Sequence, residues 1–140
     1  MREPAPLLVA EDSDDDFILL RRALREAAID NPVLRFRDGT ELTRFLEQIP
    51  PAELGAVADQ TWLLLLDITM PLMNGFEVLT WLAGHKGFPK IRTVMLSGTY
   101  RTTDIDRALA LGAVDFLVKP VNAQLLLGVM GKKLVTPLQS

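Results

Sequence analysis

Short apolar runs alternate with amphipathic segments five times along the chain, and this alternation limits the possible folds more than any other feature. Four runs lie at Leu7–Ala10, Leu63–Leu66, Thr93–Leu96 and Val114–Val118, and a fifth segment, Val33–Arg37, mixes apolar residues with arginines as an outer strand would. Apolar runs of this length are typical of strands that are buried on both faces of a parallel sheet. We therefore expect an α/β fold, a three-layer α/β/α sandwich with helices on both faces of a five-stranded parallel sheet.

The segments between the runs carry helix signals at their ends. Ser13 is a suitable N-cap for a first helix whose first turn holds three aspartates, and Asn31-Pro32 would stop that helix. Asn122 is a suitable cap for a last helix that we expect to run to about Leu134. Residues 52–60 are expected to form a loop.

Composition narrows the class of protein further. A chain of 140 residues, with 49% hydrophobic and 24% charged residues, indicates one globular domain over residues 1–140 with its core at about 6–135 and no output domain. The net charge of −3 gives no reason to expect a nucleic-acid surface, and the lack of cysteine excludes disulfides and thiol catalysis. No membrane-spanning run and no signal peptide occur, so we expect a cytoplasmic location.

Polar residues follow the buried runs at the points where four of the expected strands end. Glu11 and Asp12 follow the first run, Asp67 the third, Ser97 the fourth and Lys119 the fifth. The carboxyl ends of parallel strands meet at one edge of the sheet, which is where such sheets bind ligands. One acid after a strand is often only a helix cap, but four suitable strand ends together indicate a site. We expect Asp67 to be an exposed tip at this edge.

The residue types at this edge predict a particular chemistry. Three neighbouring carboxylates repel one another and raise one another's pKa, and a hard divalent cation relieves that repulsion. Oxygen ligands favour Mg²⁺. A carboxylate nucleophile, a cation, the hydroxyl of Ser97 and the ammonium of Lys119 are the groups that phosphoryl transfer requires.

These residues resemble the receiver domain of bacterial two-component response regulators over almost the whole chain. The matching motifs, in the family's order, are LLVAED, LLLLDITMPLMNG, VMLSG and GAVDFLVKP, and the spacings from Asp67 to Ser97 and from Ser97 to Lys119 also fit the family. The resemblance implies a flavodoxin-like fold with strand order 2-1-3-4-5. The interval from Asp12 to Asp67 is longer than is usual in the family, with the surplus around residues 50–60. In this respect the chain is similar to the stand-alone receivers that partner bacterial phytochromes, which often pair as dimers.

The resemblance also implies roles for the residues at the predicted edge. Asp67 is similar to the aspartate that accepts a phosphoryl group from the phosphohistidine of a partner kinase. Mg²⁺ would be held by Glu11, Asp12 and Asp67, and the backbone carbonyl of Thr69 would be a further ligand. Lys119 would neutralise a phosphoryl oxygen. Glu11 stands where the family more often has aspartate, which adds a methylene group and keeps the ligand type.

Further positions match the family's switch and loops. Ser97 would move toward the phosphoryl group and hydrogen-bond it. The side chain of Phe116 would follow that motion inward. Serine and phenylalanine replace the usual threonine and tyrosine at these two positions, so the switch position lacks the tyrosine hydroxyl. The other implied positions are Gly98 for phosphate entry, Pro71 and Gly75 in the acceptor loop, Thr69 and Thr99 beside the attacking water, and Pro120 after a cis peptide bond.

The implied function is a signalling switch and not an enzyme with a separate substrate. A sensor histidine kinase or a histidine phosphotransfer protein would phosphorylate Asp67, and the altered surface would act on a downstream protein target. A pseudo-receiver that binds partners without phosphorylation is an alternative. A small Mg²⁺-dependent phosphatase would need an acid-base aspartate where Thr69 stands. Apolar residues along the last helix suggest either a broadly buried helix or a homodimer through the last two helices and the final strand.

Overall fold

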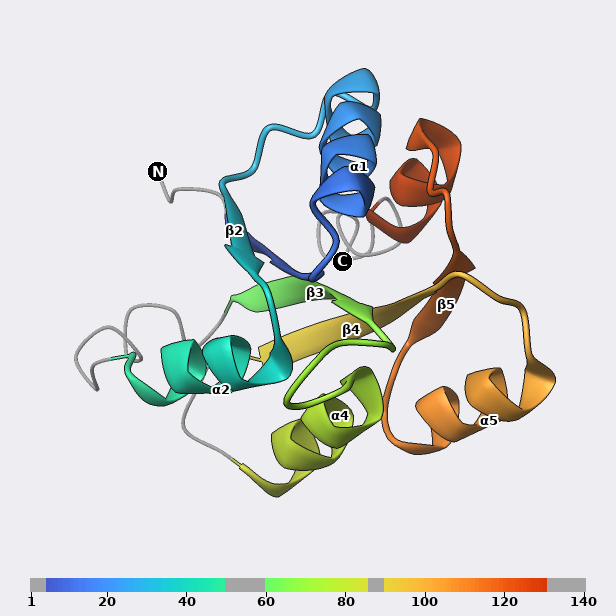
Figure 1. Cartoon of the computed structure of the whole chain (residues 1–140). Helices are drawn as coiled ribbons and strands as arrows, with labels where there is room; N and C mark the ends of the chain where they lie inside the picture. Colours follow the sequence, from blue (N-terminus) through green and yellow to red (C-terminus); the bar gives the residue numbers. More distant parts are fainter. Residues whose placement is uncertain (1–4, 50–59, 86–89, 131–140) are drawn as a thin grey trace, which may run out of the picture.

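The computed structural model describes residues 5–49, 60–85 and 90–130, which form a five-stranded parallel sheet between helices (Figure 1). The strands are β1 (Leu7–Ala10), β2 (Val33–Phe36), β3 (Thr61–Asp67), β4 (Lys90–Ser97) and β5 (Asp115–Val118). The helices are α1 (Asp14–Glu26), α2 (Gly39–Glu47), α4 (Gly75–Gly84) and α5 (Thr102–Ala110), and residues 123–130 are also helical. The strands pair in the order β2-β1-β3-β4-β5, so the predicted fold class and strand order are confirmed.

Both faces of the sheet are buried, because successive side chains of a strand point to opposite sides. Leu8 and Leu64 belong to one hydrophobic core, and their chain neighbours Leu7 and Leu63 belong to a second core. Each of these four leucines exposes 2% of its surface or less. The unbroken apolar runs in the sequence therefore supply both cores.

The helices divide between the two cores. Figure 1 shows α1 and the helix of residues 123–130 on one face of the sheet, and α2, α4 and α5 on the other. Leu24 and Leu126 pack into the core on the first face, which we call the α1-side core. Leu42 and Val78 pack into the core on the second face, which we call the α4-side core. The three-layer arrangement is thus confirmed.

Some element boundaries differ from the expected ones. β3 begins at Thr61 and includes Asp67, and β4 begins at Lys90, because these two strands pair at seven positions in the middle of the sheet. The helix α1 ends at Glu26, earlier than expected, and Ala28 then adopts a left-handed φ of 57°. A residue in that conformation commonly follows the end of a helix.

Three expectations fall outside the described residues and stay predictions. They are the loop over residues 52–60, the end of the last helix near Leu134, and the limits of a single domain over residues 1–140. Within the ranges that the structure does describe, no helix combines the length and the apolar character that crossing a membrane requires.

Candidate functional site

The carboxyl ends of β1, β3, β4 and β5 meet at one edge of the sheet, because all four strands run in the same direction. Glu11 and Asp12 follow β1, Asp67 and Ser97 are the last residues of β3 and β4, and Lys119 follows β5. The sheet thus gathers the polar residues that the sequence placed at its strand ends. We call these five residues the strand-end site.

Asp67 is buried in this site. It exposes 5% of its surface, so the expectation of an exposed tip was wrong. Its Oδ2 accepts a hydrogen bond from Lys119 Nζ at 3.1 Å, and its Oδ1 accepts one from the Thr69 backbone N–H at 3.4 Å. A strand end appears open in a sequence, but here Glu11 from the end of β1 and Lys119 from the end of β5 lie against the carboxylate.

Lys119 lies at the centre of an ion-pair network. Its Nζ is 2.6 Å from Glu11 Oε1, 2.9 Å from Asp16 Oδ2 and 3.1 Å from Asp67 Oδ2. An ammonium group has three N–H donors and no acceptor. These three carboxylates can therefore satisfy every donor of a lysine whose side chain is only 17% exposed.

Burial and charge act on the pKa values of this network. Burial is the largest cause of the raised pKa of Glu11, and the neighbouring Asp67 adds to it against the opposing effects of Lys119 and the Ser13 N–H. Burial alone would lower the pKa of Lys119. The hydrogen bonds to Glu11 and Asp16, together with the charge of Asp67, outweigh burial and raise that pKa above its ordinary value. Lys119 therefore stays charged.

Glu11, Asp12 and Asp67 form a group that could hold a metal ion. Their carboxylate oxygens lie within 4.8 Å of one another, and Asp12 is exposed while the other two are buried. A donor set made only of carboxylate oxygens fits a hard divalent cation. The cation's charge would also relieve the repulsion that helps to raise the pKa of Glu11.

The end of β4 carries the predicted hydroxyl. Ser97 is buried, and its Oγ accepts a hydrogen bond from the Thr99 backbone N–H at 3.1 Å. Gly98 and Thr99 are exposed, and a Cβ added at Gly98 would meet no heavy atom within 4 Å. Phe116 of β5 is half-buried against the α4-side core.

The loop after Asp67 is fixed by the start of α4. The Gly75 N–H donates to the Ile68 carbonyl oxygen at 2.8 Å, and a Cβ at Gly75 would lie 2.5 Å from the Asp67 carbonyl oxygen. Within this loop Pro71 is exposed. Leu72 is 81% exposed and has a left-handed φ of 66°.

The peptide bond between Lys119 and Pro120 is cis, as expected from the resemblance. A cavity of about 370 Å³ lies on the α1 side of this segment. Its polar lining comes from Glu11, Asp16 and Lys119, and the remaining lining residues are Leu19, Leu20, Leu96, Gly98, Pro120 and Val121. The strand-end site therefore borders free volume.

Two residues of this region were not found from the sequence. Asp16 was interpreted only as a favourable charge at a helix N-terminus, yet it pairs with Lys119. Arg35 of β2 donates from Nε to the Glu11 carbonyl oxygen at 3.1 Å and pairs through Nη1 with Asp14 at 2.7 Å. The outer strand therefore supports the site, although no contribution from it was expected.

The chain matches the family model for the response regulator receiver domain over residues 7–130. Among curated proteins, the response regulator Rcp1 of Synechocystis sp. is 29% identical over 119 residues, which cover 85% of this chain and 79% of Rcp1. Several other curated relatives are longer, and the match spans less than two thirds of their length.

Solved structures agree with this match. The bacteriophytochrome response regulator AtBRR is 31% identical, with a TM-score of 0.76 and coverage of 93% of this chain and 92% of AtBRR. The Mn²⁺-bound form of Rcp1 is 28% identical, with a TM-score of 0.69 and coverage of 93% and 92%. The family model and the solved structures therefore match the same group of signalling proteins.

Proposed function

Because the chain belongs to the response regulator receiver domain family, we propose that it is a phosphoryl-accepting switch with Asp67 as the acceptor. The observation that carries this proposal is the contact of Asp67 with Lys119 within one group of carboxylates at the end of β3. A carboxylate nucleophile beside oxygen ligands and an ammonium group suits phosphoryl transfer.

In the proposed reaction, an Asp67 carboxylate oxygen attacks the phosphorus of a phosphohistidine on a histidine kinase or a phosphotransfer protein. The O–P bond forms as the N–P bond breaks, and the imidazole leaves with the electron pair and takes up a proton from solvent. Lys119 Nζ, 3.1 Å from Asp67 Oδ2, could donate to an oxygen of the transferred group. Ser97 Oγ, at the end of the next strand, could donate a second hydrogen bond.

We propose Mg²⁺ as the cation, held by Glu11, Asp12 and Asp67 with the backbone carbonyl of Thr69 as a further ligand. When bound, it would neutralise charge on the phosphoryl oxygens. Two observations support this assignment: the oxygen-only donor set, and the Mn²⁺-bound form of the related Rcp1.

The proposed output is a shift between two conformations. Ser97 Oγ, which accepts from the Thr99 N–H, would turn toward the phosphoryl group, and half-buried Phe116 would move inward behind it. Thr69 and Thr99 are both exposed at this edge, where they could affect the access of water to the acyl phosphate.

The proposed partners are a histidine kinase or phosphotransfer protein, a downstream protein target and a second copy of this chain. Leu109, Leu125 and Leu127 are 48%, 40% and 49% exposed on α5 and on the helix of residues 123–130. These helices, together with β5, are the proposed dimer surface of a cytoplasmic protein. Light scattering that finds only a monomer, with and without a phosphoryl analogue, would remove the dimer from the proposal.

Labelling of Asp67 tests the main proposal. The chain would be incubated with acetyl phosphate and Mg²⁺ and analysed by Phos-tag electrophoresis and mass spectrometry. We expect a label on the unmodified chain and on Asp15→Asn, and none on Asp67→Asn. Asp15 is a suitable control because it is exposed in the first turn of α1. Equal labelling of the two variants would refute Asp67 as acceptor, and no label with intact partner binding would favour the pseudo-receiver.

A further inference from the structure

Lys119 has one carboxylate partner, Asp16, outside the carboxylate group, by which we mean the three residues Glu11, Asp12 and Asp67 that could hold a metal ion. Its ammonium contacts Glu11 and Asp67, which are members of the carboxylate group, and also Asp16 at 2.9 Å. Among the described residues, that group contains Glu11, Asp12 and Asp67 but not Asp16. A cation bound there would share two of the three partners of Lys119.

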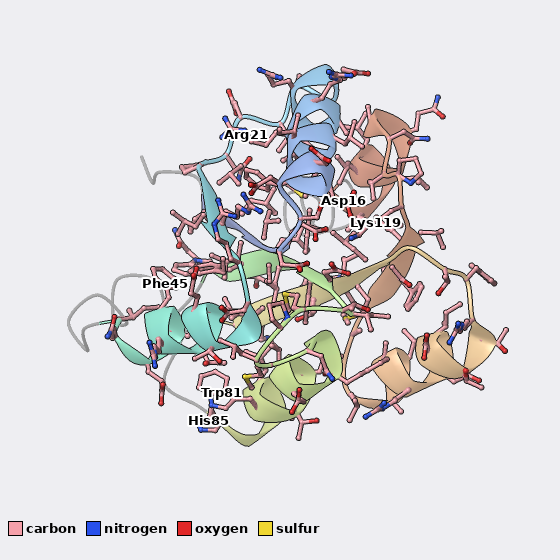
Figure 2. All side chains as sticks on the ribbon, viewed as in Figure 1. Asp16, Arg21, Phe45, Trp81, His85 and Lys119 are labelled. Atoms are coloured by element: carbon pink, nitrogen blue, oxygen red, sulfur yellow. The ribbon has the colours of Figure 1, made fainter. Side chains whose placement is uncertain are left out.

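Asp16 reaches Lys119 because of how α1 begins. Ser13 caps the helix, and its Oγ accepts from the Asp16 backbone N–H at 3.2 Å. Figure 2 shows Asp16 at the start of α1 and Lys119 beyond the end of β5, and their side chains form the 2.9 Å ion pair. The two preceding aspartates differ: Asp14 pairs with arginines of the β2 region, and Asp15 is exposed.

Asp16 differs from the other two carboxylate partners of Lys119 in how a bound cation would affect it. A divalent cation draws the lone pairs of Glu11 and Asp67 and repels the nearby ammonium. A phosphoryl group on Asp67 would need Lys119 to stay at the edge. Asp16 lies outside the group formed by Glu11, Asp12 and Asp67, so its contact with Lys119 does not compete with a cation bound there.

We propose that Asp16 is a positioning residue that anchors Lys119 at the strand-end site when a cation and a phosphoryl group occupy it. The inference rests on the proposed function. Without this anchor, Lys119 would have only Glu11 and Asp67 as partners and would compete with the cation for them. Both Mg²⁺ affinity and the rate of phosphorylation would then fall.

The test compares Asp16→Asn with Asp15→Asn, which removes the same charge from the same helical turn without touching Lys119. Isothermal titration calorimetry measures Mg²⁺ affinity without any phosphorylation, and labelling with acetyl phosphate gives the rate. For loss of a charge-assisted bond to a partly exposed carboxylate, we expect Asp16→Asn to lower both by about fivefold to tenfold relative to Asp15→Asn. Asp16→Glu keeps the charge and should give values between those of the unmodified chain and Asp16→Asn.

A second pair of variants shows whether the effect of Asp16 on Mg²⁺ affinity depends on Lys119. In a chain that already carries Lys119→Gln, adding Asp16→Asn should change Mg²⁺ affinity no more than adding Asp15→Asn does. The inference is overturned if Asp16→Asn equals Asp15→Asn, if it binds Mg²⁺ more tightly, or if its loss persists in Lys119→Gln. An unmodified chain that binds Mg²⁺ but takes no label would instead refute the proposed function.

Discussion

Replacing Gly75 by alanine places a methyl group against the backbone at the end of β3. The new Cβ would lie 2.5 Å from the Asp67 carbonyl oxygen and 2.9 Å from the Ile68 Cα, whereas ordinary contacts begin at 3.4 Å. The third close atom, Met95 Cε at 2.9 Å, belongs to a flexible side chain and can move away. The two backbone atoms can move only if α4 separates from β3.

The expected cost follows from this geometry. Overpacking of a well-packed site costs about 1–3 kcal/mol, and a clash with backbone belongs at the upper end of that range. We therefore expect Gly75→Ala to lose about 3 kcal/mol of an unfolding free energy of about 5–15 kcal/mol. Because Asp67 itself must move, labelling with acetyl phosphate should also slow at temperatures where the variant is folded.

Urea unfolding, followed by circular dichroism and tryptophan fluorescence, measures this loss. With a denaturant slope of about 1–3 kcal/mol per molar urea, the midpoint should fall by at least about 1 M. Gly84→Ala is the matched control, since it lies in the same helix and its Cβ would meet nothing within 4 Å. It should be neutral or stabilise by up to about 1 kcal/mol. If Gly75→Ala unfolds at the same midpoint as the unmodified chain, the close approach of α4 to β3 is wrong.

Two other perturbations test the strain and the charges near the site. Leu72 is exposed with a left-handed φ, so Leu72→Asn should raise the unfolding free energy by about 1 kcal/mol, and a loss in urea unfolding would contradict that strain. Burial, followed by the neighbouring Asp67, raises the pKa of Glu11, so folded protein keeps this proton to higher pH than the unfolded chain does. The stability that Glu11 contributes is therefore complete below its unfolded pKa of 4.5 and is lost as pH rises through the folded value. Urea midpoints of the unmodified chain should fall relative to those of Glu11→Gln as the pH rises above 4.5, and Mg²⁺ should reduce that fall. Parallel pH profiles of the two proteins would refute this prediction.

The fold could be predicted because its signals are local and repeated. Each apolar run is long enough for a buried strand, and each following segment has helical spacing. Parallel strands then require their carboxyl ends to meet, and this alone predicts that Glu11, Asp67 and Lys119 lie together. The contacts of Asp67 with Lys119 and of Glu11 with Lys119 agree with that reasoning.

The details that escaped prediction depend on distant parts of the chain. Asp14, Asp15 and Asp16 have the same local role at a helix N-terminus, and only the position of β5 shows that Asp16 meets Lys119. The burial of Asp67 likewise depends on side chains from two other strand ends. Sequence spacing identifies which edge carries the chemistry, but tertiary packing decides which carboxylate is covered.

The division of strand side chains between the α1-side and α4-side cores affects how such a chain can diversify. A helix residue such as Leu24 packs into one core, so a replacement there can be balanced by another change in the same layer. Adjacent strand residues such as Leu64 and Leu65 serve opposite layers, so the strands must satisfy both layers at once. The helical layers can therefore acquire new outer surfaces, and with them new partners, separately from each other.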